Sequence, residues 1–242
     1  MTIPCRENLD TKVLKMKKAI IAVVSALLLL TISLCSCSSK QDSFVDKGDG
    51  RYVDNKTAIT YHAAIGCYEP IAPTEEVYGT MGDSVLYRMS GIDPQRWICD
   101  NTGSVLYAEG ESLPELGKMN IARAEITESD TVVYSIEEST EITRIIQAYE
   151  SGDSIRRPMV TESALSINWR IRFADETIGV YYVLAYIELK EDHIGVRDDG
   201  TEINYGRSFI FNRFDGTCVP VGDALDVYVS RYLGQGGAVS ES

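Results

Sequence analysis

Two cysteines separated by a single serine, Cys35 and Cys37, form the closest pair of thiols in the sequence. Thiols at this spacing can bind a metal ion or act as a redox pair. A cysteine can also carry a covalent lipid, which requires one thiol and a suitable segment before it. The residues before the pair therefore decide which chemistry to expect.

Those residues have the features of a secretion signal. Lys17 and Lys18 form a short positive region, and residues 19–34 follow as an uncharged, mostly apolar run. The run is shorter than the roughly 20 apolar residues that span a bilayer, and its length is typical of the apolar region of a signal peptide. The pattern resembles a bacterial lipoprotein signal, in which a leucine at position −3 and a small residue at −1 precede the lipid-modified cysteine.

Cys37 fits this motif, with Leu34 at −3 and Ser36 at −1, although Cys35 is an atypical residue at −2. Cys35 is the second choice, because it would put the bulky Leu34 at −1. The resemblance implies a signal peptide over residues 1–36 and an uncharacterised bacterial lipoprotein, anchored by lipid to the extracytoplasmic face of the cell membrane. An uncleaved anchor and an ordinary signal peptide are the alternatives.

Residues 1–15 match no part of such a signal, because they are hydrophilic and include Glu7 and Asp10. We therefore expect translation to begin at Met16.

The stretch Met81–Val85 contains Gly-Asp-Ser. It resembles the Gly-Asp-Ser block of the SGNH hydrolases, in which the serine is the nucleophile and a later Asp-x-x-His supplies the base. Here the downstream histidine, His193, has Lys190 three residues before it, and the oxyanion blocks of the family are not recognisable. Ser84 is thus a weak catalytic candidate, and the tripeptide also suits a turn before a strand.

The remaining cysteines and histidines suggest structural roles. Cys67 and Cys99 can form a disulfide in an oxidising compartment, which leaves Cys218 over; the alternative is three small buried thiols. His62 and His193 are too few for the usual His-rich zinc sites, and no Cys-x-x-Cys pair is present. The sequence also has no Walker A, GxGxxG or His-Glu-x-x-His motif, so we expect no metal and no cofactor.

The charge balance narrows the class of partner. The 242 residues include 36 Asp and Glu against 23 Lys and Arg, for a net charge of −13. This balance disfavours nucleic acids and anionic membrane surfaces, which attract basic proteins. The hydrophobic content of 44% is sufficient for a folded body. We expect a small-molecule ligand or a protein partner, in addition to the membrane reached through the N-terminal lipid.

The chain divides by composition into several regions. Residues 37–50 are small and polar and predict a flexible linker, in which Phe44 and Val45 are too isolated to form a core. Short β-branched and aromatic runs predict a β-rich region over 51–128. An α+β region is expected over 129–233, and a disordered tail over 234–242.

Two segments have helical periodicity. Ile142, Ile145, Ile146 and Tyr149 form an apolar stripe, with Ser139 or Ser135 as N-cap and Gly152 as the stop. A second stripe begins near Leu225.

The segment Leu165–Phe173 alternates as a strand with one buried face, and Arg170 and Arg172 lie on the polar face. Residues 178–189 are apolar on both faces and predict a central strand. The expected fold class is therefore α+β, mainly antiparallel sheet with two amphipathic helices in the C-terminal half.

Two functions follow as hypotheses. The first is a non-enzymatic module that binds a ligand or a protein, or acts in the cell envelope. The alternative is a cell-envelope serine hydrolase that uses Ser84. A transporter's substrate-binding protein is less favoured, since the chain lacks alternating β and α units.

Overall fold

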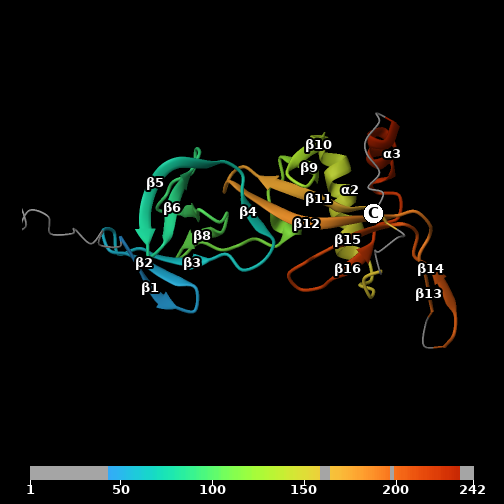
Figure 1. Cartoon of the computed structure of the whole chain (residues 1–242), viewed down its shortest axis with the longest axis horizontal. Helices are drawn as coiled ribbons and strands as arrows, with labels where there is room; N and C mark the ends of the chain where they lie inside the picture. The colour runs from blue at the N-terminus through green and yellow to red at the C-terminus, as the bar shows by residue number, and fades with distance from the viewer. Residues whose placement is uncertain (1–42, 159–163, 197–198, 235–242) are drawn as a thin grey trace, which may run out of the picture. The chain divides into compact units, whose positions relative to one another are not determined.

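Figure 1 shows the computed structural model, which describes residues 43–158, 164–196 and 199–234. The lipid-signal residues Cys35 and Cys37, the possible start at Met16 and all of the predicted tail except Gly234 lie outside these ranges. None of the helices within them is both long and apolar enough to cross a membrane.

The first sheet has seven antiparallel strands in the order β1-β2-β3-β8-β7-β6-β5. The strands are β1 (Phe44–Gly48), β2 (Arg51–Asp54), β3 (Thr60–Ala63), β5 (Pro73–Met81), β6 (Ser84–Met89), β7 (Trp97–Asp100) and β8 (Val105–Ala108).

The two ends of this strand order meet. The Ser43 hydroxyl accepts a hydrogen bond from the Thr80 amide at 2.7 Å, which ties the start of β1 to β5. Phe44 packs over Gly79, where a Cβ atom would lie 2.6 Å from the Phe44 ring. Phe44 is 2% exposed and belongs to the apolar cluster inside this sheet. The prediction of a flexible linker over residues 37–50 is therefore wrong from Phe44 onward, because Phe44 fills the space that Gly79 leaves.

The second sheet has the order β10-β9-β11-β12-β15-β16, and β4 also pairs with β12. Its strands are β4 (Tyr68–Pro70), β9 (Arg123–Glu128), β10 (Thr131–Ile136), β11 (Ala164–Asp175), β12 (Val180–Leu189), β15 (Ser208–Phe211) and β16 (Cys218–Pro220). β13 (Ile194–Val196) and β14 (Glu202–Asn204) form a separate hairpin.

The expected boundary near residue 128 does not separate the two sheets. β4 and β9 both lie within the predicted region 51–128, yet both pair within the second sheet. Residues 42–242 form one compact unit. Strand pairing between segments far apart in sequence overrides the change in composition.

Alternation along β11 sets the two faces of the second sheet. Trp169, Ile171 and Phe173 are buried in the main apolar cluster, and the intervening Arg170 and Arg172 lie on the opposite face. The predicted alternation is confirmed for these described side chains.

Two helices contribute to that apolar cluster. In α2 (Ser139–Ser151), Ile142 and Ile145 are buried, and Gly152 ends the helix as predicted. The expected serine N-cap is wrong: Glu138 occupies the cap position and makes no side-chain capping hydrogen bond. In α3 (Asp226–Gly234), Tyr228 and Val229 pack into the same cluster.

The expected α+β class is wrong, because the fold is β-rich: 46% of the residues that the structure describes are in strands and 12% in helices. The prediction gave weight to the order of helices and strands in the C-terminal half. The short strands β1 to β3 and β5 to β8, however, form a seven-stranded sheet of their own, and the helices are only a small cover on the second sheet. A short 3₁₀ helix, η1 (Leu116–Lys118), connects the parts of the chain between β8 and β9.

Candidate functional site

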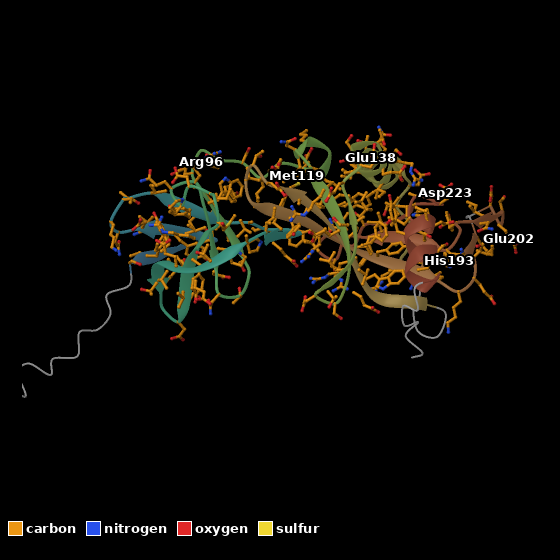
Figure 2. All side chains as sticks on the ribbon, turned by 90° about the horizontal axis from the view of Figure 1, so that it is seen from above. Arg96, Met119, Glu138, His193, Glu202 and Asp223 are labelled. Carbon is orange, nitrogen blue, oxygen red and sulfur yellow. The ribbon has the colours of Figure 1, made fainter. Side chains whose placement is uncertain are left out.

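The weak catalytic candidate Ser84 lies at a hairpin turn. It opens β6 and pairs with Met81 across the β5–β6 hairpin, after Gly82 with φ +55°. His193 precedes β13 (Figure 2), and its ring stacks on that of Tyr205 with centroids 6.0 Å apart. No hydrogen bond in the described part of the chain joins Ser84 to a histidine. Since a serine nucleophile needs a base within hydrogen-bond reach, this arrangement lacks the basis for acyl transfer.

Of the two alternatives that the sequence left open for the cysteines, the structure has the free thiols: Cys67, Cys99 and Cys218 are all free. Cys67 donates a hydrogen bond to Asn212 Oδ1 at 3.0 Å, whereas Cys99 is buried in a different apolar cluster around Trp97. Burial raises the pKa of the Cys99 and Cys218 thiols to about 11. These two thiols are therefore protonated near neutral pH, as small buried side chains.

The histidines and acids do not assemble into a metal centre among the described residues, where no group of three or more potential ligands occurs. The ring of His62 stacks against Tyr107, with centroids 5.6 Å apart.

A cleft of about 300 Å³ opens on the second sheet, on the face of β11 and β12 that carries Arg170. Val183 and Ala185 on β12 are its small apolar lining residues, which we call the floor, and Ala185 lies opposite Arg170 of β11 in the strand register. The remaining lining residues come from the segment before and within β4 and from the β15–β16 turn: Gly66, Cys67, Tyr68, Glu69, Arg213 and Phe214.

Asn212 fixes the β15–β16 turn that carries two of these residues. It is 4% exposed, and its Oδ1 accepts hydrogen bonds from the Phe214 amide at 2.9 Å and from the Cys67 thiol. Its Nδ2 donates to Asp215 Oδ2 at 3.0 Å. One side chain therefore shapes the turn and connects it to the segment leading into β4, so both walls of the cleft are held together.

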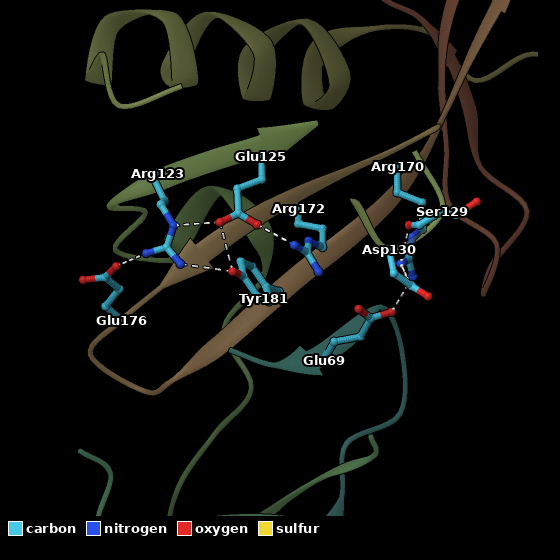
Figure 3. A network of polar contacts seen from close by, with 9 residues as sticks. All are labelled: Glu69, Arg123, Glu125, Ser129, Asp130, Arg170, Arg172, Glu176 and Tyr181. Carbon is cyan, nitrogen blue, oxygen red and sulfur yellow. Dashed lines mark hydrogen bonds and ion pairs between the residues drawn. The ribbon is translucent and has the colours of Figure 1, made fainter. Parts of the chain in front are cut away.

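Arg170 is fully engaged on the opposite wall. Its guanidinium donates to Glu69 Oε1 at 3.1 Å, to Asp130 Oδ1 at 2.8 Å and to the Ser129 carbonyl at 2.9 Å (Figure 3). Arg170 therefore crosses over β12 and links β11 to β4. Glu69 retains its second carboxylate oxygen, Oε2, without a hydrogen bond from the described residues.

A second network supports the same face next to the cleft. Glu125 accepts hydrogen bonds from Arg123 at 2.9 Å, from Arg172 at 2.6 Å and from the Tyr181 hydroxyl at 3.1 Å (Figure 3). Burial by itself raises the pKa of the Glu125 carboxyl, but the two arginines outweigh burial and hold this pKa below 4.5. Arg123 also pairs with Glu176. This network joins β9, β11 and β12, and we interpret it as the scaffold of the face.

The charges that line the cleft oppose the charge of the chain. Arg170 and Arg213 are cationic and Glu69 is anionic, so the lining has a net positive charge within a chain of net charge −13. Arg213 is exposed, and its side chain makes no ion pair with the described residues, unlike Arg170. An unengaged guanidinium beside an apolar floor can bind an anionic group.

Comparisons with protein-family models, with curated proteins and with solved structures find no match to this chain.

Sequence reasoning placed Arg170 and Arg172 on the polar face of a strand but missed Arg213, Phe214 and Asn212 as site residues. The Asp215-Gly216 turn signal was visible in the sequence. What the sequence did not reveal is that β4 and β15 pair with the same edge of β12, which brings the turn next to Cys67.

Proposed function

We propose that this chain is a non-enzymatic binding module, tethered by lipid on Cys37 to the extracytoplasmic face of the cell membrane, with its ligand in the cleft over β12. The observation that carries the binding role is the unengaged Arg213 beside the apolar floor of Val183 and Ala185. A hydrolase based on Ser84 has no comparable support, because no histidine reaches that serine within the described residues.

The tether in this proposal is short. Only residues 38–43 lie between the lipidated Cys37 and Phe44, the first residue of β1. At about 3.5 Å per residue, the chain from Cys37 to Phe44 spans at most roughly 25 Å. The first sheet would therefore work close to the membrane surface.

Metabolic labelling with an alkyne analogue of palmitate tests the tether. The full chain is expressed in a bacterium that processes lipoproteins, beside the variants Cys37→Ala and Cys35→Ala. We expect label in the wild type and in Cys35→Ala, and loss of label and of membrane association in Cys37→Ala. Label that persists in Cys37→Ala but disappears in Cys35→Ala would move the anchor to Cys35, and absence of label in all three would refute the tether.

A fluorophosphonate probe tests the non-enzymatic part of the proposal. The probe modifies activated serines, and we expect the same background labelling in the wild type and in Ser84→Ala. Labelling of the wild type that vanishes in Ser84→Ala would establish an activated nucleophile and overturn this part.

A further inference from the structure

Arg213 differs from the other arginines on this face of the second sheet. Arg123, Arg170 and Arg172 each donate to a carboxylate. The Arg213 side chain is exposed and has no such partner in the described ranges. Its neighbour Asp215 is engaged by Asn212 Nδ2 and by the Thr217 amide at 2.8 Å. The guanidinium of Arg213 therefore keeps its planar set of donors free for an acceptor from outside.

The surface beside this guanidinium is apolar. Phe214 follows Arg213 directly, and both residues line the cleft. Phe214 is 62% exposed. Asn212 Oδ1 fixes the Phe214 amide, so the ring is presented from a turn held by hydrogen bonds. An exposed aromatic ring and the small floor residues favour a flat apolar group over a highly hydrated one.

The charge of the lining sets the charge of the ligand. Arg213 can compensate one negative charge, since Arg170 is already engaged by Glu69 and Asp130. Glu69 also lines the cleft and would repel a second negative charge. A monoanion therefore fits this cleft better than a phosphate dianion.

We infer that the cleft binds a small monocarboxylate with a flat, apolar body, its carboxylate on Arg213 and its body against Phe214 and the β12 floor. This inference rests on the proposed binding function and adds the chemical class of the ligand. The two parts of the ligand act together, because a carboxylate alone gains little at an exposed arginine.

Isothermal titration calorimetry of the full mature chain with phenylacetate tests the inferred class of ligand. Acetate supplies the charge without the ring, 2-phenylethanol supplies the ring without the charge, and inorganic phosphate supplies the alternative anion. Arg213→Gln removes the cation, and Arg51→Gln is the matched control, an exposed arginine outside the cleft. Phe214→Ala removes the ring, with the exposed Val77→Ala as its control.

We expect saturable binding of phenylacetate that is weakened about tenfold or more by Arg213→Gln and also weakened by Phe214→Ala, with both controls like the wild type. Acetate, 2-phenylethanol and phosphate should bind more weakly than phenylacetate. If 2-phenylethanol binds as well as phenylacetate and Arg213→Gln has no effect, the carboxylate class fails while a ligand-binding cleft stands. Tighter binding of phosphate would overturn the monoanion, and no binding of any probe would overturn the class inferred here.

A separate thermal-shift screen of chemically varied ligands then distinguishes failure of the inferred ligand class from failure of the proposed binding function. If the carboxylate class has failed, a ligand that stabilises the wild type but not Phe214→Ala would still support the proposed binding function. The absence of such a hit counts against both.

Discussion

Asn212 connects more of the candidate site than any other single side chain described above. Its amide oxygen accepts from Cys67 and from two backbone amides of the turn, those of Phe214 and Asp215, while its amide nitrogen donates to Asp215. A buried amide with these partners costs more to remove than an exposed one, because the partners lose acceptors that water does not readily replace. The shape of the turn, and with it the position of Arg213, therefore depends on this residue.

We expect Asn212→Ala to lower the free energy of unfolding by about 1–3 kcal/mol. Urea denaturation followed by tryptophan fluorescence measures this change. Asn120→Ala is the control, since that side chain is exposed and makes no described hydrogen bond. Equal stability of the two variants would contradict the role given to Asn212.

Glu125 gives a second prediction, which depends on pH. Its pKa is lower in the folded chain than its ordinary value of 4.5, because Arg123 and Arg172 stabilise the carboxylate. Folding thus favours the ionised form, so this stabilisation is complete above about pH 4.5 and is lost as the pH falls through the lowered pKa. We expect Glu125→Gln to be destabilised by about 2 kcal/mol at pH 7 and to lose less stability on acidification than the wild type.

Urea unfolding at pH 7 and at pH 3 measures both effects. Glu115→Gln is the control, because Glu115 pairs with Lys118 at an exposed position and its loss should change stability little. A pH dependence of Glu125→Gln identical to that of the wild type would exclude Glu125 as a source of acid sensitivity.

At the scale of elements, patterns within one segment predicted structure better than relations between segments did. The alternation of β11 and the stripe of α2 are local, and the structure has a strand and a helix there. By contrast, β1 looked like linker because a single phenylalanine in a polar stretch has no pattern. Phe44 becomes core only because β5 offers Gly79, 35 residues later, as a place for its ring.

In the candidate site, too, features within one segment were predictable and relations between segments were not. The polar face with Arg170 and Arg172 was predictable from alternation, since the period of a strand is two residues. The cleft was not, because it requires β4 and β15 to pair with one edge of β12. No local pattern specifies that pairing. The sequence left the state of Cys67 and Cys99 open for the same reason, because only the fold carries the two residues into different apolar clusters.

For the secondary-structure elements, we predict the effect on stability of a substitution in β1. Phe44→Ala removes a buried ring and should destabilise the chain by about 3–5 kcal/mol, as for other large-to-small changes in a core. Val45→Ala is the control on the same strand, since Val45 is 37% exposed. Thermal or urea unfolding compares the two variants. Similar small effects would mean that residues 44–48 belong to the linker after all.

At the scale of the whole molecule, an acidic chain with a proposed short N-terminal tether carries a cleft whose lining has the opposite charge. The negative charge of the chain disfavours anions over most of the surface, so an anionic ligand must rely on a local site. The Arg170 and Glu125 networks hold β4, β9, β11 and β12 together around that site. The molecule thus presents a hydrogen-bonded face, and the proposed ligand contacts Arg213, which makes no ion pair with the residues that the structure describes.

The most direct test of this account is a titration of the isotopically labelled mature chain with phenylacetate, followed by amide chemical shifts in two-dimensional NMR. We expect saturable shifts concentrated at Gly66–Glu69, Val183–Ala185 and Arg213–Phe214, with the first sheet unchanged. Shifts that are absent from these segments, or that are equally large in the first sheet, would contradict a binding site in the cleft over β12.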